Sequence, residues 1–162
     1  MLKESRGHFN DEYELSTMEL GAAAMGCIVR TATKKRTEER FACKTFVLSS
    51  VKGRKQQQST IALLRNEIDM LRSLDHPNII RAYESYESGG DLHLIMELCT
   101  GGDLGARRCT ETQAAKVIRQ CLSAIHYAHH RGICHRDIKF ENILWENPTP
   151  GAQIKASPHT HT

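Results

Sequence analysis

Short stretches rich in apolar residues and bounded by turn residues predict a small antiparallel sheet in the first part of the chain. Three such stretches follow one another from residue 13, separated first by a Gly/Ala-rich turn and then by a charged turn. Two more follow a His-Pro-Asn break and pair across a turn that contains Gly89-Gly90. The predicted strands are Tyr13–Leu20, Gly26–Thr33, Arg40–Phe46, Ile79–Tyr86 and Leu92–Glu97.

Apolar residues at three- and four-residue steps predict two helices. The first follows the polar segment 49–59 and is inserted between the third and fourth strands. The second opens after Thr110, where Gln113 completes a capping-box pattern, and runs to about Arg131 before Gly132. A short strand is predicted at Ile143–Trp145. The apolar stripes are Ile61, Leu64, Ile68 and Leu71 in the first helix, and Ala114, Ile118, Cys121, Leu122, Ile125 and Ala128 in the second.

The order of these elements predicts an α+β fold in two parts. We expect a flexible lead-in at residues 1–12 and a sheet-rich lobe with one helix at residues 13–98. After the Gly-Gly pair at 101–102 the pattern becomes helical, so residues 99–155 form a second lobe with few helices. Residues 156–162, rich in Pro, Thr and His, are expected to form an unstructured tail.

Composition narrows the class of protein without identifying it. Hydrophobic residues make up 40% of the chain and charged residues 25%, as in globular proteins. The net charge of +3 is mild, and the basic run at 34–36 is followed at once by two glutamates, which indicates a hairpin tip rather than a nucleic-acid site. The chain has no apolar run long enough for a membrane span and no signal-peptide pattern. Six scattered cysteines suit reduced thiols, so we expect an intracellular, cytoplasmic protein; no oligomeric state is indicated.

Two features of the predicted sheet could bind phosphate. The turn between Gly21 and Gly26 lets backbone amides approach phosphate oxygens, although a plain hairpin turn would look the same. Lys44 lies in an otherwise apolar strand, where a charged amine needs a partner or a route to water. Glu67, beside the apolar stripe of the first helix, is a candidate partner for it.

Two further segments complete the pattern. The strand that ends at Glu97 and Cys99 runs directly into the Gly-Gly pair, which leaves backbone groups suited to a flat, hydrogen-bonding ligand, or simply a strand end. The loop Cys134–Leu144 carries Asp137 and, five residues later, Asn142. In phosphoryl transfer such an aspartate can accept the proton of the attacking hydroxyl, and the asparagine can hold a metal.

Taken together, these segments resemble the catalytic domain of eukaryotic protein kinases over about residues 13–155. The loop with Lys139 between the aspartate and the asparagine is similar to the serine/threonine version. The phrases RGHFNDEYEL, LDHPNIIRAYESYE, LIMELCTGGDL and RGICHRDIKFENIL most resemble the calcium-dependent protein kinases of plants and protozoan parasites. The resemblance implies a five-stranded antiparallel N-lobe sheet with one helix, followed by a helical C-lobe that is incomplete here.

The resemblance also implies ATP and Mg²⁺ as cofactors, a protein substrate, and a role for each matching residue. Asp137 would be the catalytic base, Lys139 the partner of the γ-phosphate and Asn142 a magnesium ligand. Asp103 and Glu141 stand where related kinases contact arginines of the substrate, so basic residues near the phosphorylation site are expected. Around the nucleotide, the implied residues are Gly21 and Gly26 over the phosphates, Lys44 with Glu67 at the α- and β-phosphates, Ile28 and Ala42 above adenine, Met96 as gatekeeper, Glu97 and Cys99 in the hinge, and Leu144 below adenine.

Four departures from the family pattern affect this expectation. Ala23 replaces a loop glycine, Phe140 replaces a proline, and the segment Gly105–Cys109 is several residues shorter than in the family. Most seriously, no Asp-Phe-Gly follows Lys155, although its aspartate would bind magnesium, and the long helix would keep an exposed apolar patch. We therefore expect a truncated kinase domain with little or no activity alone.

Three alternatives stay open at this stage. The chain could be a non-catalytic, pseudokinase-like module that binds a nucleotide or a partner. It could also be a wrongly assigned fragment of a full-length active kinase. Finally, the histidines at 126, 129 and 130, or the Cys134-His135 pair, could hold zinc, but the same positions are ordinary for a kinase helix and loop.

Overall fold

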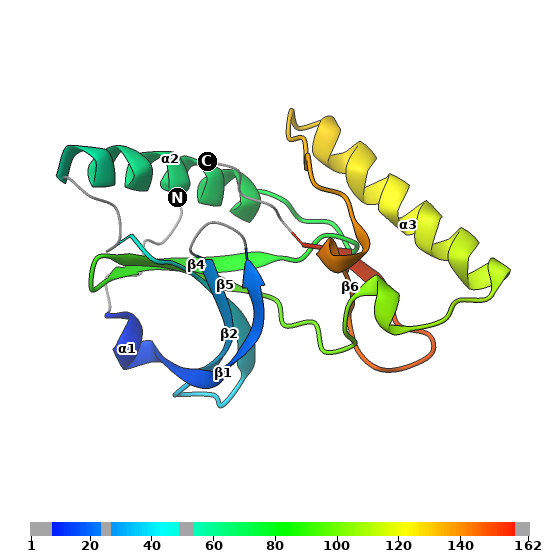
Figure 1. Ribbon diagram of the computed structural model, residues 1–162, viewed down its shortest axis with the longest axis horizontal. Helices are drawn as coiled ribbons and strands as arrows, with labels where there is room; N and C mark the ends of the chain where they lie inside the picture. The colour runs from blue at the N-terminus through cyan, green and yellow to red at the C-terminus, as the bar shows by residue number, and fades with distance from the viewer. Residues whose placement is uncertain (1–7, 24–26, 49–53, 158–162) are drawn as a thin grey trace. The chain divides into compact units, whose positions relative to one another are not determined.

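The computed structural model describes residues 8–23, 27–48 and 54–157 of the chain (Figure 1). They divide into two compact units, which are described separately. The first comprises residues 8–72 and 82–98, and the second comprises residues 73–81 and 99–157. No helix of the described residues is long and apolar enough to cross a membrane.

The first unit is built on a five-stranded antiparallel sheet, which confirms the predicted N-lobe architecture. The strand order is β1-β2-β3-β5-β4. Strand β3 has the predicted bounds, and the others differ from prediction by a few residues. The strands are β1 (Tyr13–Ala23), β2 (Cys27–Lys34), β3 (Arg40–Phe46), β4 (Ala82–Ser88) and β5 (Asp91–Met96).

Helix α2 (Arg54–Arg72) packs on this sheet through the predicted stripe. Leu64, Ile68 and Leu71 are buried. The helix begins at residue 54, inside the segment expected to be a polar connection. Lys, Arg and Gln are good helix formers, so the helix extends beyond the point where its apolar stripe starts.

The two faces of the sheet carry different elements. Residues directly opposite in antiparallel strands share a face. Lys44 lies across from Val29 on β2 and from Leu94 on β5, and its charge interacts with Glu67 of α2. On the other face His93 stacks on Phe9 of the short helix α1 (Phe9–Glu12), with ring centroids 4.2 Å apart. Figure 1 shows α1 and α2 on opposite sides of the sheet.

The end of the predicted lead-in is therefore part of the fold. Phe9 is only 1% exposed and also contacts the rings of Tyr13 and Tyr86. A single aromatic residue in a polar stretch leaves no periodic signal, and its burial depends on an aromatic cluster formed by distant strands. Residues 9–12 are thus corrected from lead-in to helix.

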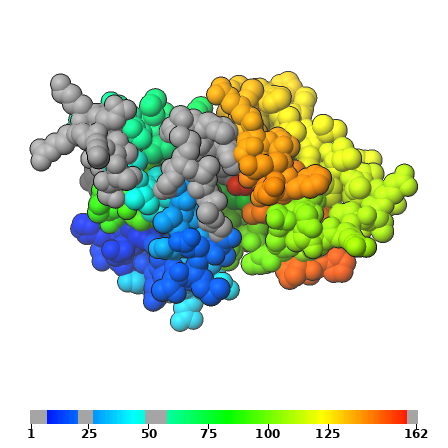
Figure 2. Space-filling model, viewed as in Figure 1, coloured from blue at the N-terminus to red at the C-terminus, as the bar shows by residue number. Residues whose placement is uncertain are grey.

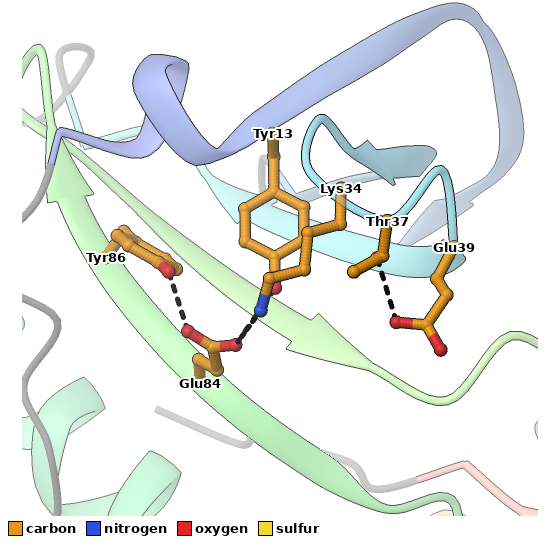
Figure 3. A network of polar contacts seen from close by, with 6 residues as sticks. All are labelled: Tyr13, Lys34, Thr37, Glu39, Glu84 and Tyr86. Carbon is orange, nitrogen blue, oxygen red and sulfur yellow. Dashed lines mark hydrogen bonds and ion pairs between the residues drawn. The ribbon is translucent and has the colours of Figure 1, made fainter.

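A polar network closes the edge of this aromatic cluster. The carboxylate of Glu84 accepts hydrogen bonds from the hydroxyls of Tyr86 (2.6 Å) and Tyr13 (3.0 Å), and Lys34 Nζ lies 3.2 Å away. Figure 3 shows Tyr86 and Lys34 converging on the two oxygens of Glu84. Burial alone would raise the pKa of Glu84, but the hydrogen bonds outweigh it and the pKa lies below its ordinary value. Burial and the bond to Glu84 together raise the pKa of Tyr13.

The second unit is organised around helix α3 (Glu111–His129). The predicted capping box is present: the Thr110 hydroxyl accepts from the Gln113 amide at 3.3 Å, and the Gln113 side chain accepts from the Thr110 amide at 2.9 Å. Val117 packs on Ile143, Trp145 and Ile154. On the other side of α3, Ile118 and Leu122 are 58% and 60% exposed, which agrees with the predicted apolar patch.

Two short strands and two single turns complete this unit. They are η1 (Leu104–Ala106), η2 (Phe140–Asn142), β6 (Ile143–Trp145) and β7 (Ile154–Ala156). Ala156, expected to begin the tail, is buried instead: its amide donates to Asn78 O and its carbonyl accepts from the Ile80 amide, both at 2.9 Å. Because residues 79 and 80 contact β7 in this way, β4 starts at Ala82 rather than Ile79.

Candidate active site

Lys44 is a buried amine in the centre of the sheet. It is 8% exposed, and its Nζ lies 5.2 Å from the centroid of the Phe46 ring. Burial lowers the pKa of Lys44, while the nearby Cys27 and Glu67 oppose that shift. An ammonium at such a place is stabilised only by nearby negative charge, so the site suits an anionic group.

Glu67 reaches Lys44 because of its position on α2. Its neighbours in the apolar stripe, Leu64, Ile68 and Leu71, are buried, so Glu67 stands at the border of the packed face and is half-buried. Its carboxylate opposes the effect of burial on the pKa of Lys44. The structure thus brings together the two residues that the sequence suggested as a pair.

The strand register changes one predicted residue of the nucleotide site. Ala42 shares a face with Lys44, and Met96 lies directly across from Ala42. Ile28, however, lies across from Thr45 and hence on the opposite face of the sheet, while Val29 lies across from Lys44. Val29, which the sequence analysis missed, therefore lies on the face of Ala42 and Lys44 in place of Ile28.

The two predicted loop glycines differ in how far the structure describes them. The backbone of Gly21 lies in β1, paired with Val29 of β2. Gly26 lies outside the described residues. The predicted role of Gly26 over the phosphates therefore stays a prediction.

Irregular backbone follows β5. Met96 ends the strand, and the half-buried Glu97 and Cys99 lie beyond it, the first in the sheet unit and the second in the helical unit. In the helical unit, residues 100–103 then run beside β6. The Gly101 amide donates to Trp145 O at 3.0 Å, and the Trp145 amide donates to Gly102 O at 2.8 Å. Leu144 forms a bridge with Asp103.

The loop after α3 brings together the three predicted catalytic residues. Asn142 Nδ2 donates to the carboxylate of Asp137 at 2.9 Å and to its backbone carbonyl at 2.8 Å. Lys139 Nζ lies 3.1 Å from the same carboxylate oxygen, Oδ2. Segments of this loop lie at the surface, where the residues after α3 are coloured orange in Figure 2. Asp137 is therefore a fixed, solvent-accessible carboxylate beside an ammonium.

His135 holds the start of this loop. Its Nε2 lies 2.5 Å from Ser157 O, and its Nδ1 accepts from the Asp137 amide at 3.4 Å. Arg136 between them has φ +60°, a left-handed conformation that is unusual for a residue other than glycine. Such backbone conformations persist where surrounding contacts fix them.

The arrangement of Asn142 bears on metal binding. Because its amide nitrogen donates to Asp137, its Oδ1 oxygen takes part in neither bond and is available to a cation. Oxygen ligands of this kind suit Mg²⁺. Among the described residues, no three His, Cys, Asp or Glu side chains form a cluster that could hold a metal, so the histidines of α3 offer no such site there.

The two acidic residues assigned to substrate recognition differ in exposure. Glu141 is exposed in the turn η2, directly before Asn142. Asp103 is half-buried beside Leu144. Either carboxylate could accept hydrogen bonds from a guanidinium.

Comparison with known proteins agrees with this geometry. The protein kinase domain family matches residues 15–157. Calcium-dependent protein kinase 5 of Plasmodium falciparum is 36% identical over 151 residues, 90% of this chain and 25% of that protein. Calcium-dependent protein kinase 14 of Arabidopsis thaliana is 36% identical over 163 residues, 96% and 30% of the two chains. Human calcium/calmodulin-dependent protein kinase type IV is 36% identical over 156 residues, 93% and 31%.

The chain thus spans between 25% and 31% of the length of these three relatives. The match nevertheless covers both the Lys44–Glu67 pair and the Asp137–Asn142 loop. In both places the structure brings charged side chains together. The chain belongs to the protein kinase family, as a domain of the serine/threonine type similar to the calcium- and calmodulin-dependent kinases.

Proposed function

We propose that the chain binds Mg²⁺-ATP and that its residues serve transfer of the γ-phosphoryl group to a serine or threonine hydroxyl of a protein. The observation that carries this proposal is the Asp137 loop, in which one carboxylate oxygen is held by Asn142 at 2.9 Å and by Lys139 at 3.1 Å. This carboxylate accepts the proton of the attacking hydroxyl. Lys139 neutralises charge on the transferred group.

The sheet unit supplies most of the nucleotide-binding residues of the proposal, and the helical unit supplies Cys99 and Leu144. Lys44, positioned by Glu67, contacts the α- and β-phosphates, and the backbone between Gly21 and Gly26 covers them. Met96 closes the back of the adenine site, and the backbone of Glu97 and Cys99 contacts the adenine edge. The apolar surfaces around adenine come from Val29, Ala42 and Leu144.

Metal binding is assigned to the Oδ1 oxygen of Asn142. When bound, Mg²⁺ would neutralise charge on the phosphates. The 162 residues contain no Asp-Phe-Gly, whose aspartate is the second metal ligand of the family. We therefore propose that the chain 1–162 by itself is weakly active or inactive. Within a longer protein, its kinase activity would depend on whether further residues supply the second metal ligand. The competing function, a nucleotide- or partner-binding module without catalysis, predicts no turnover in either context.

For the substrate, we propose a protein segment with basic residues near the acceptor hydroxyl. The exposed Glu141 and the half-buried Asp103 support this, because both carboxylates can pair with arginine. Location in the cytoplasm is part of the same proposal, supported by six cysteines that are all free thiols.

Turnover of Mg²⁺-ATP tests the proposal. We expect the chain to phosphorylate a serine peptide with an upstream arginine slowly, and Asp137→Asn to abolish what turnover there is, by at least about 100-fold. The same peptide without arginine should react more slowly. Glu111→Gln, at an exposed position on α3, is the matched control and should leave the rate unchanged. Turnover that survives in Asp137→Asn would contradict the catalytic role, and equal rates on the two peptides would contradict the basic preference.

A further inference from the structure

Arg107 makes an unusual set of contacts in the shortened segment between the Gly-Gly pair and α3. Its guanidinium donates to the backbone carbonyl of Thr149 at 2.9 Å and to that of Gly101 at 3.4 Å, and it also donates to the carbonyl of Asn147. The guanidinium carbon lies 4.8 Å from the centroid of the buried Trp145 indole. One side chain therefore contacts two separate stretches of backbone.

These two stretches have different places in the unit. Gly101 lies in the segment that follows the hinge residues, whereas Asn147 and Thr149 lie in the loop between β6 and β7. That loop is ordered by its own side chains, since the Asn147 carboxamide oxygen accepts from the Thr149 amide at 3.0 Å and from the Thr149 hydroxyl. Arg107 joins this preformed loop to the backbone at Gly101.

The backbone at Gly101 is tightly packed, with no space for a side chain. A Cβ atom there would clash with the Asn147 carbonyl, the Trp145 Cβ and Nη2 of Arg107. The backbone of residue 101 thus lies directly against the Arg107 guanidinium, the Trp145 Cβ atom and the Asn147 carbonyl. Loss of Arg107 would remove one wall of this contact and its hydrogen-bond donors at the same time.

The segment that Arg107 holds carries residues assigned to the nucleotide and the substrate. Residues 100–102 are hydrogen-bonded to Trp145 and Glu146, and Asp103 forms a bridge with Leu144. The β6–β7 loop continues directly from β6, the strand that contains Leu144. A contact that holds this loop against residue 101 therefore also constrains the backbone of β6, which carries Leu144.

We propose that Arg107 is a positioning residue for nucleotide binding: it sets the place of Leu144, and of the backbone that follows the hinge, without touching the ligand. This inference rests on the proposed function, which assigns Leu144 to the adenine site, and it is therefore measured through nucleotide binding. A methionine side chain has no donor for the carbonyls of Gly101, Asn147 and Thr149. A lysine ammonium can donate hydrogen bonds to some of them, but it lacks the planar guanidinium and its stacking on Trp145.

Nucleotide affinity tests this role. A trinitrophenyl-ATP analogue, whose fluorescence rises on binding, is titrated into the chain 1–162 and its Arg107→Met and Arg107→Lys variants. We expect Arg107→Met to raise the Kd about tenfold and Arg107→Lys to fall between it and the wild type. Hydrogen exchange of the Gly101 and Trp145 amides should become faster in the same order.

Two controls separate positioning from a loss of stability. Arg108→Met removes the neighbouring exposed arginine, for which no hydrogen bond or ion pair is found among the described residues, and should leave the Kd unchanged. Ala124→Gly destabilises the same unit at a buried position of α3 that is not part of the cluster around Trp145, and should change the melting temperature but not the Kd. If Arg107→Met alone is unfolded, Arg107→Lys still decides the question.

The outcomes are distinct. A higher Kd for the Arg107 variants, with the Kd of both controls unchanged, supports the inference. A wild-type Kd in both Arg107 variants overturns it while leaving the proposed nucleotide binding intact. A Kd raised equally by Ala124→Gly shows a merely structural role and also overturns it. If the wild-type chain fails to bind the analogue, both this inference and the proposed function are wrong.

Discussion

Phe9→Ala is expected to lower the free energy of unfolding of the sheet unit by about 3–5 kcal/mol, the range for a fully buried phenylalanine. The ring is 1% exposed and lies against His93, Tyr13 and Tyr86, so its removal leaves a cavity bounded by three rings. Urea unfolding monitored by tyrosine fluorescence measures the change. The same variant should release helix α1, the first described element of the chain, from the sheet.

Phe140→Ala is the matched control for this experiment. It deletes the same side chain at a position that is 66% exposed, so we expect a change within about 0.5 kcal/mol. If Phe9→Ala were no more destabilising than this control, residues 9–12 would be the dispensable lead-in that the sequence alone predicts.

Glu84→Gln is expected to destabilise the same unit by about 2–4 kcal/mol. The substitution keeps the shape but removes the charge that holds Lys34 and accepts from Tyr13 and Tyr86, and an amide nitrogen then faces these donors. Breaking a fully buried pair costs about 3–5 kcal/mol, and this one is partly exposed, which reduces the effect. The control is Glu87→Gln, whose partner Arg65 and whose own carboxylate are both well exposed, with a change of at most about 1 kcal/mol.

The pH dependence gives the Glu84 experiment a second readout. The pKa of Glu84 is lowered on folding, so its contribution is fully present above its ordinary pKa of 4.5 and is lost as the pH falls through the lower folded value. The difference in unfolding free energy between wild type and Glu84→Gln should therefore be constant near neutral pH and shrink below pH 4.5. A difference that stays constant under acid conditions would show that the charge of Glu84 contributes nothing.

Much of the fold follows from local pattern. The five strands are short runs bounded by turn residues, and α2 and α3 carry apolar stripes. Thr110 with Gln113 marks the start of α3, so the antiparallel sheet and both helices could be predicted from the sequence. The partnership of Lys44 with Glu67 could be predicted as well, because each is a charged residue at the border of an apolar pattern and each needs compensation.

Features that depend on distant contacts could not be predicted. Phe9 is buried only because β1, β4 and β5 assemble the cluster that receives it, and Ala156 is a strand residue only because residues 78–80 lie beside it. Neither produces a periodic signal. In both cases the local sequence is polar or rich in turn-forming residues, so reasoning from neighbours along the chain assigns it to a terminus.

A different physical cause puts Val29, rather than Ile28, on the face of the sheet that carries Lys44. In the β2–β3 hairpin the Lys34 amide donates to Glu39 O, which closes a four-residue turn with Glu38 in a left-handed conformation (φ +59°). From this turn the register runs without interruption to Val29 opposite Lys44. A turn longer or shorter by one residue would bring Ile28 to the face of Lys44 instead, because side chains alternate with every residue. Counting from the glycines of the loop cannot detect such a change.

Nucleotide binding by the Lys44–Glu67 pair tests the central claim most directly. Titrating the chain 1–162 with the trinitrophenyl-ATP analogue should give saturable binding that excess Mg²⁺-ATP displaces. Lys44→Met should weaken it by about 10- to 100-fold, because a charge-assisted contact to phosphate is worth roughly 1.5–3 kcal/mol. Lys35→Met, in the exposed hairpin turn, should bind like the wild type. Binding that is absent from the wild type, or that Lys44→Met leaves unchanged, would contradict the account.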